Sequence, residues 1–249
     1  GAMVYGTATN CNFTQNSAEN GGAIYQGEAY NCNFTGNTAE NSGGAMYEGT
    51  ATNCNFNNNH ASTYGGAMAY SDASNCNFTG NTASSGGAIR GADDLRNFAI
   101  NCNFIGNSAE EGGAMLYGNA TNCNFTGNTA TQNVAGAINY GEANNCNFNN
   151  NHASTYGGAM YGSDAYNCNF TGNTATEKGG AIYDGEAINC TFIGNSAENG
   201  GAMYGGAINC TFKQNTATNY PSIRTFRRDS ASCSALRSRS PVLFFSKSS

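Results

Sequence analysis

Residues 31–47 read Asn-Cys-Asn-Phe-Thr-Gly-Asn-Thr-Ala-Glu-Asn-Ser-Gly-Gly-Ala-Met-Tyr, and this stretch decides the fold of the 249-residue chain. Its first part follows the pattern Cys-x-Phe-x-x-Asn-[Ser/Thr/His]-Ala, which occurs ten times at intervals of 20 to 26 residues. Its second part, Gly-Gly-Ala-[Ile/Met], alternates with the first along the chain. Self-similarity at such a period is typical of a solenoid in which each repeat forms one coil.

Within each repeat, Cys and Phe alternate with polar residues, which is the period-two pattern of a half-buried strand. Gly36-Asn37 and Gly43-Gly44 are turn sequences, and no helical period is present. We therefore predict an all-β fold, a right-handed parallel β-helix of about ten coils over residues 1–218. Coils about 4.8 Å apart would stack identical residues, with the Phe rings and the thiols inside and the Asn of Phe-x-x-Asn at a corner.

The charge distribution separates the repeats from the end of the chain. Residues 1–218 contain four basic and fifteen acidic residues, whereas residues 219–249 contain six basic residues and one acid. An acidic body argues against nucleic acid as a partner, because phosphates require a basic surface. No apolar run is long enough for a membrane helix, so we expect no membrane insertion. We expect residues 219–249 to be disordered or to form a poor C-terminal cap.

The alternation of Gly-Gly-Ala-Ile with Phe-x-x-Asn resembles the repeats of the chlamydial polymorphic outer-membrane proteins. The stretch Asn-Cys-Thr-Phe-Ile-Gly-Asn-Ser-Ala-Glu-Asn-Gly-Gly-Ala-Met-Tyr at residues 189–204 is also similar to adhesin-like surface proteins of methanogenic archaea. The resemblance implies an extracellular or cell-surface location and a non-enzymatic role as adhesin or structural stalk. It implies host or neighbouring-cell surface molecules, including glycans, as partners. Stacked coils with open ends also allow end-to-end self-association.

The residues that flank Cys and Phe are predicted to point outward in three rows: the residue before Cys, the residue after Cys and the residue after Phe. The alternative function is ice binding, because a flat lattice of short polar side chains resembles the ice-binding faces of β-solenoid antifreeze proteins. The candidate binding residues on this face are Asn31, Asn33, Thr35, Asn75, Asn77, Thr79, Asn122, Asn124, Thr126, Asn167, Asn169 and Thr171.

A polysaccharide-active enzyme is the third possibility, because many lyases and hydrolases are β-helical. Such chemistry needs carboxylates that converge, or carboxylates with Arg or Lys and a metal. The one irregular coil carries Arg-Gly-Ala-Asp-Asp-Leu-Arg at residues 90–96, which we interpret as a solvated, self-paired loop. We therefore name no catalytic residue.

No cofactor is required by any motif, although calcium is a possible ligand. Glu142, Asp164 and Glu186 occupy equivalent positions in three successive coils, with Asp184 nearby. Like charges stacked about 5 Å apart repel one another unless a cation lies between them. The alternative is a solvated acidic edge.

Two further residue types, His and Tyr, are considered as possible sites. The segment from Asn55 to Met68 recurs verbatim 92 residues later, so His60 and His152 are interpreted as substituted Ser/Thr corner positions rather than as a site. Tyrosines that follow Gly-Gly-Ala-[Ile/Met] form a partial external stripe, which we interpret as covering a corner; glycan binding is the alternative. These are Tyr25, Tyr47, Tyr161, Tyr183 and Tyr204.

Overall fold

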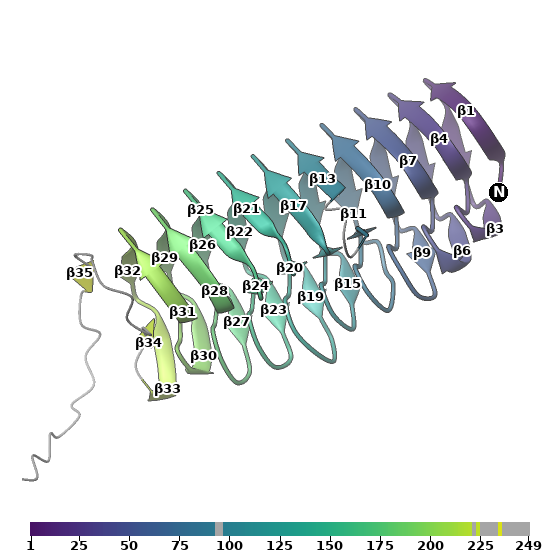
Figure 1. The fold of residues 1–249 in the computed structure, drawn as a ribbon. Coiled ribbons are helices and arrows are strands. Elements are labelled where there is room, and N and C mark those ends of the chain that lie inside the picture. Colours follow the sequence, from purple (N-terminus) through teal and green to yellow (C-terminus); the bar gives the residue numbers. More distant parts are fainter. Residues whose placement is uncertain (93–96, 221–222, 225–233, 236–249) are drawn as a thin grey trace, which may run out of the picture.

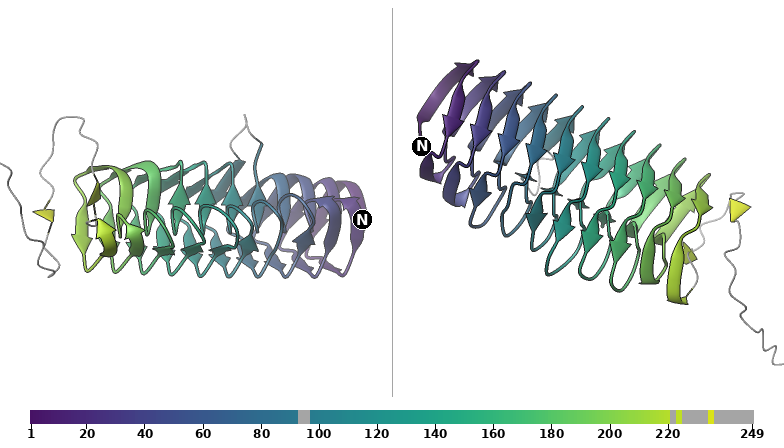
Figure 2. Two further views of the ribbon diagram at one scale, coloured as in Figure 1. Left: turned by 90° about the horizontal axis from the view of Figure 1, so that it is seen from below. Right: turned by 180° about the vertical axis from the view of Figure 1, so that it is seen from behind.

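The computed structural model describes residues 1–92, 97–220, 223–224 and 234–235, and these form one rod of stacked coils (Figure 1). Every element in the described ranges is a strand. About ten coils follow one another along a single axis, so residues 20 to 26 positions apart in the sequence lie side by side (Figure 2). The predicted all-β parallel solenoid is confirmed.

Each coil contributes strands to three faces. The second coil shows the pattern, with β4 (Ile24–Tyr30) on the first face, β5 (Asn33–Thr35) on the second and β6 (Thr38–Ser42) on the third. Each strand pairs in parallel with its equivalent in the next coil, and Phe34 pairs with Phe56. Because the register is kept, each residue type forms a row along the rod.

The first sheet has fifteen strands. They are β1 (Met3–Thr9), β4, β7 (Met46–Thr52), β10 (Met68–Ser74), β12 (Ile89–Arg90), β13 (Asn97–Ile100), β16 (Met115–Leu116), β17 (Gly118–Thr121), β20 (Ile138–Asn139), β21 (Glu142–Asn144), β24 (Met160–Tyr161), β25 (Asp164–Tyr166), β28 (Ile182–Ile188), β31 (Met203–Ile208) and β34 (Ile223–Arg224).

The second sheet has eleven strands. They are β2 (Asn12–Thr14), β5, β8 (Asn55–Asn57), β11 (Asn77–Thr79), β14 (Asn103–Ile105), β18 (Asn124–Thr126), β22 (Asn147–Asn149), β26 (Asn169–Thr171), β29 (Thr191–Ile193), β32 (Thr211–Lys213) and β35 (Ser234–Ala235).

The third face is made of two short sheets. One contains β3 (Ser17–Asn20), β6 and β9 (His60–Ala61); the other contains β15 (Ser108–Ala109), β19 (Thr129–Ala130), β23 (His152–Ala153), β27 (Thr174–Ala175), β30 (Ser196–Asn199) and β33 (Thr216–Tyr220). Isolated bridges such as His60 with Thr82 and Thr82 with Ser108 continue the face between the two sheets.

An unbroken stack of ten phenylalanine rings fills the interior behind the second sheet. Neighbouring ring centroids from Phe13 to Phe212 are 4.7–4.9 Å apart, with the planes within 7° of parallel. The eight central rings are fully buried. The Ile/Met row of Gly-Gly-Ala-[Ile/Met] is buried across the same core. The predicted inward facing of Phe is therefore confirmed.

The predicted Asn corner is also confirmed, and its hydrogen bonding explains why Asn recurs there. In the middle of the stack, Asn59 donates from its backbone N–H and from Nδ2 to Oδ1 of Asn81, at 2.9 and 3.0 Å. Its Nδ2 also donates to the backbone carbonyl of Phe34 at 3.1 Å. The amide is fully buried, and these bonds satisfy it. The same arrangement recurs from coil to coil.

The thiols form a second buried ladder. Cys54 Sγ accepts the backbone N–H of Cys32 at 3.4 Å and donates to the carbonyl of Thr52 at 3.2 Å. All ten cysteines from Cys11 to Cys210 are free thiols, and all except Cys11 are buried. Burial raises the pKa of the Cys32 thiol. The thiols therefore act as small core groups, as predicted.

The two glycines of Gly-Gly-Ala serve different purposes. The first has positive φ, and Ala135 adopts the same conformation with φ of 61° where the sequence departs from glycine. The second has no such φ, but a Cβ on Gly44 would lie 2.0 Å from the carbonyl oxygen of Gly66 in the next coil. Close approach of the coils therefore excludes any side chain at the second position.

Part of the basic tail continues the stack. Strand β34 pairs in parallel with β31, and β35 pairs with β32, so that Ile223 lies beside Met203 and Ala235 beside Phe212. Residues 223–224 and 234–235 therefore lie in register with the last coil, and whether residues 219–249 form a C-terminal cap stays a prediction. The rest of the predicted tail beyond residue 220 lies outside the described residues.

Candidate binding surface

The outer face of the second sheet presents two regular rows of short polar side chains. The strands that hold the candidate residues have the sequence Asn–Phe–Thr, and their central Phe points inward. In other strands of the sheet, Ile105, Ile193 and Lys213 interrupt the row after Phe. The first row is the residue after Cys, and the second is the residue after Phe. Of the candidate residues in these rows, Thr79 is half-buried, and the others are exposed: Asn33, Thr35, Asn77, Asn124, Thr126, Asn169 and Thr171.

The exposed asparagines are hydrogen-bonded to one another along the rod. Asn33 Nδ2 donates to Asn12 Oδ1 at 2.9 Å, and Asn55 Nδ2 donates to Asn33 Oδ1 at 2.9 Å. This one-directional ladder continues to Asn169 without a break. Each amide thus uses one N–H group and one acceptor position in hydrogen bonds to neighbouring asparagines, and these bonds hold the side chains in a fixed orientation.

The third predicted row does not lie on this face. The asparagines before Cys have φ between 52° and 57°, so each is a left-handed corner that precedes the strand. Asn tolerates this conformation better than most residues, which accounts for its presence at the corner in all ten coils. The four candidates in this row, Asn31, Asn75, Asn122 and Asn167, are exposed. The three predicted rows therefore point outward, but the row before Cys lies at the corner rather than within the strand, because the period-two pattern ends at Cys.

The carboxylates proposed for calcium are neighbours, and those of Glu142 and Asp164 already accept hydrogen bonds. Glu142 lies beside Asp164 in the register of β21 and β25. Glu142 Oε1 accepts Asn144 Nδ2 at 2.7 Å, and Asp164 Oδ1 accepts the backbone N–H of Glu186 at 2.9 Å. Among the residues that the structure describes, no three His, Cys, Asp or Glu side chains gather in a way that could hold a metal ion. This arrangement favours the solvated acidic edge over calcium.

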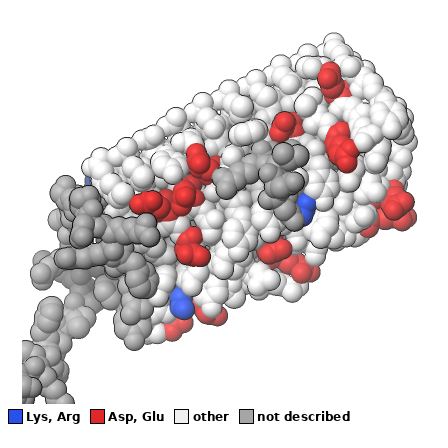
Figure 3. Space-filling model, viewed as in Figure 1, with Lys and Arg blue, Asp and Glu red and all other residues white. Residues whose placement is uncertain are grey.

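Acidic side chains are spread along the face in view rather than gathered at one place (Figure 3). The visible surface therefore shows no strongly charged centre.

Arg90 departs from the prediction of a solvated loop. Its side chain is only 8% exposed, and its guanidinium lies over three tyrosine rings at 4.6, 4.9 and 5.6 Å from their centroids. These rings belong to Tyr64, Tyr70 and Tyr117. Cation–π attraction of this kind is strongest where the cation is removed from water. Residues 93–96 of the predicted loop lie outside the described residues.

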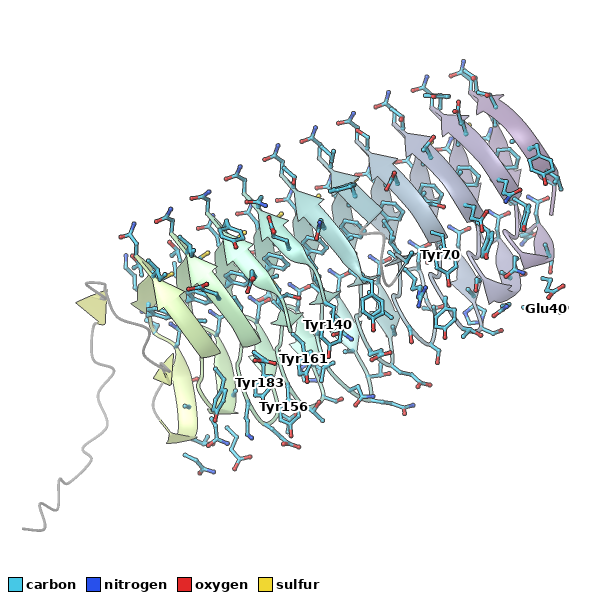
Figure 4. The ribbon with its side chains drawn as sticks, viewed as in Figure 1. Glu40, Tyr70, Tyr140, Tyr156, Tyr161 and Tyr183 are labelled. Atoms are coloured by element: carbon cyan, nitrogen blue, oxygen red, sulfur yellow. The ribbon has the colours of Figure 1, made fainter. Side chains whose placement is uncertain are left out.

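The predicted tyrosine stripe is present, and its rings stack on one another rather than on solvent. Tyr161 and Tyr183 stack at 5.4 Å, and Tyr183 and Tyr204 at 5.2 Å, while Tyr156 stacks on Tyr183 at 4.8 Å (Figure 4). Lys178 Nζ lies 5.5 Å from the ring centroid of Tyr156. Because the stacked faces are occupied by neighbouring rings, this geometry favours corner cover over a glycan platform.

The two histidines make the same contact in duplicated coils. His60 Nδ1 is 2.9 Å from Thr82 Oγ1, and His152 Nδ1 is 2.9 Å from Thr174 Oγ1. Both are exposed and pair with Thr positions of adjacent coils. They therefore occupy the predicted Ser/Thr position on the third face.

Sequence reasoning missed the group of rings around Arg90. Its tyrosines come from three different coils and two different positions in the repeat, so no local spacing signals them. The only signal was an Arg in a row that holds Tyr at five other positions, because Arg90 occupies the position equivalent to Tyr47.

The repeats match one known protein family. Residues 10–27, 75–92 and 167–184 match the family described as the Chlamydia polymorphic membrane protein repeat. Each matched segment runs from the corner before Cys, through the second and third faces, to the first residues of the next strand of the first sheet. No match was found among curated proteins. The described residues form no helix that is long and apolar enough to span a membrane. Three segments of this chain, each spanning most of one coil, are thus similar to the Chlamydia polymorphic membrane protein repeat.

Proposed function

We propose that this chain is a non-enzymatic repeat segment of a cell-surface protein and acts as an adhesin or as a structural stalk. The observation that carries the proposal is the regularity of the rod. Its buried rows repeat with the same contacts from coil to coil, and the duplicated coils even repeat the His–Thr contact. Such a molecule presents one surface many times, whereas a catalytic site needs one convergent group of residues.

The family match supports the surface location, because the repeat is named for membrane proteins. An extracellular solenoid held together by contacts between neighbouring coils is a spacer of adjustable length. In the adhesin form of the proposal, the outer face of the second sheet, with its ordered Asn and Thr rows, contacts molecules on host or neighbouring cells.

A deletion that removes whole coils tests the stalk. Removal of residues 56–147 joins Asn55 to Phe148, which restores the local sequence because the segment from Asn55 recurs 92 residues later. We expect the variant to fold and its rod to be shorter by about 19 Å, four coils at about 4.8 Å each. Small-angle X-ray scattering measures the length. Loss of folding would contradict the claim that the coils depend only on their neighbours.

Binding to cells tests the adhesin. Beads coated with the full chain should adhere to host-cell monolayers, and beads with the deletion should adhere less because fewer coils present the face. If neither kind of bead adheres although both chains are folded, the adhesin role is rejected and the structural stalk remains as the proposed function. Cleavage of neutral or acidic polysaccharides by the purified chain would overturn the non-enzymatic proposal.

Ice binding is the second candidate, favoured by the flat, regularly spaced rows of the second sheet. The exposed amides are largely committed to one another, so fewer of their groups remain to order water than in a row of threonines. Thermal hysteresis and ice-crystal shaping at micromolar protein decide the question. Faceted ice crystals would favour ice binding over the adhesin function.

A further inference from the structure

A second motif overlies the repeat on the outer face of the second sheet. The tripeptide Asn-Phe-Thr occurs at five strands, and it satisfies Asn-x-Thr, the sequence that N-glycosyltransferases accept. The candidate acceptors are Asn12, Asn33, Asn77, Asn124 and Asn169.

The strand directs both polar residues of the motif to the outer face. Residues i and i+2 of a strand lie on the same side, so Asn77 and Thr79 point outward together while Phe78 is buried. All five asparagines are exposed. Hence an enzyme can reach the amide and the hydroxyl of the motif without disturbing the core.

The amide ladder leaves one N–H of each acceptor unused. A primary amide has two N–H groups, and a chain of C=O···H–N bonds along one axis uses the hydrogen that points away from its own carbonyl. A trans secondary amide retains that hydrogen. A sugar attached to Asn77 Nδ2 would therefore replace the other hydrogen and keep the bond to Asn55 Oδ1, which measures 2.9 Å.

The spacing of the motif leaves room for sugars. From Asn33 onward, acceptor coils alternate with coils in which the residue after Phe is Asn or Ile. The intervening asparagines are Asn55, Asn103 and Asn147, and each pairs directly with an acceptor on either side. From Asn33 onward, two coils therefore separate successive acceptors by about 9.6 Å, so adjacent sugars do not overlap there. Asn12 and Asn33 lie in adjacent coils, so we expect a sugar on only one of these two.

We propose that this face is a row of N-glycosylation sites. A transferase would join the anomeric carbon of an activated sugar phosphate to Asn Nδ2. The C–N bond forms, the bond from that carbon to the phosphate oxygen breaks, and the amide proton passes to a base of the transferase. The strands of the second sheet from β2 to β29 contain no charged residue, so the acceptor face is neutral along these strands.

The proposal excludes Asn189 and Asn209, although each also precedes a Thr by two residues. Both are left-handed corners with φ of 57° and 52°, outside the strand. The geometry that supports the five strand acceptors is therefore absent at these two positions.

The test uses the folded chain, purified from a bacterium without N-glycosylation, together with an Asn-x-Ser/Thr-specific transferase and its nucleotide sugar. Peptide mapping by mass spectrometry should find the sugar on Asn77 and none on Asn55. The variant T79N should lose it, and N57T should gain a sugar on Asn55. Both substitutions use residues that occur naturally in this row, so they should leave the fold and the circular dichroism spectrum unchanged.

Two outcomes would overturn the proposal. One is a folded chain that stays unmodified while the same enzyme modifies the urea-unfolded chain or a control peptide, because the face would then not be an acceptor. The other is equal modification of Asn55 and Asn77 in the wild type, because the motif would then not select the site.

Discussion

Replacement of Phe125 by Ala tests the interior stack at its centre. The ring is fully buried and stacks on Phe104 at 4.7 Å and on Phe148 at 4.8 Å. The substitution removes both stacking contacts and leaves a cavity between rows whose spacing is fixed by the coils above and below.

The expected loss of unfolding free energy is about 3–5 kcal/mol, the usual range for Phe to Ala in a closed core. The two aromatic contacts contribute roughly 0.5–1.5 kcal/mol each within that total. Collapse of the site is opposed by neighbouring coils that are held in register, so we expect a value in the upper half of the range.

Urea unfolding followed by circular dichroism measures the loss, and Ile105→Thr is the matched control. Ile105 lies on the outer face, is 48% exposed and pairs with Thr79 and Thr126, so its change should stay within about 0.5 kcal/mol. Equal destabilisation by the two substitutions would refute the assignment of inner and outer faces.

Three other measurements probe the polar and ionisable rows. Asn128→Ala should lower the free energy of unfolding in urea by about 2–4 kcal/mol, because it leaves a buried carbonyl and a buried N–H without a hydrogen-bond partner. Asn124→Ala, at an exposed position, should lower it by under about 1 kcal/mol. The hydrogen bond to the Cys102 thiol, together with burial, raises the pKa of Cys76 from 9.0 to about 12. The folded state thus holds this proton more tightly, so melting temperature under reducing conditions should fall as pH rises from 9 toward 12, and less steeply in C76A; a rise would contradict the buried thiol ladder. Millimolar calcium should leave the melting temperature unchanged, whereas a rise that D164N abolishes would establish the calcium site.

Most of the fold can be predicted from the sequence of the repeat. Phe and Cys recur in register, and one face of a strand must be buried, so the inner rows, the Asn corner and the parallel stack follow from spacing alone. The two purposes of Gly-Gly also had a visible signal, since Ala135 replaces only the first glycine.

Features that join different repeat positions could not be predicted in this way. The rings around Arg90 come from three coils and become neighbours only through stacking. The left-handed corner before Cys was missed because Asn fits both an alternating strand and a positive-φ turn. The pairing of Ser234 and Ala235 with β32 could not be predicted because Ala235 stands at the position that Phe occupies in the ten repeats, and no Cys-x-Phe-x-x-Asn pattern surrounds it.

The verbatim recurrence of the segment from Asn55 to Met68 also has a genetic consequence. If the coding stretches of the two copies are as alike as their amino-acid sequences, unequal recombination between them would add or remove four whole coils in frame. Because the buried rows repeat from coil to coil, each product keeps complete interfaces at the new junction. Such exchanges would therefore change the length of the rod in discrete steps of four coils.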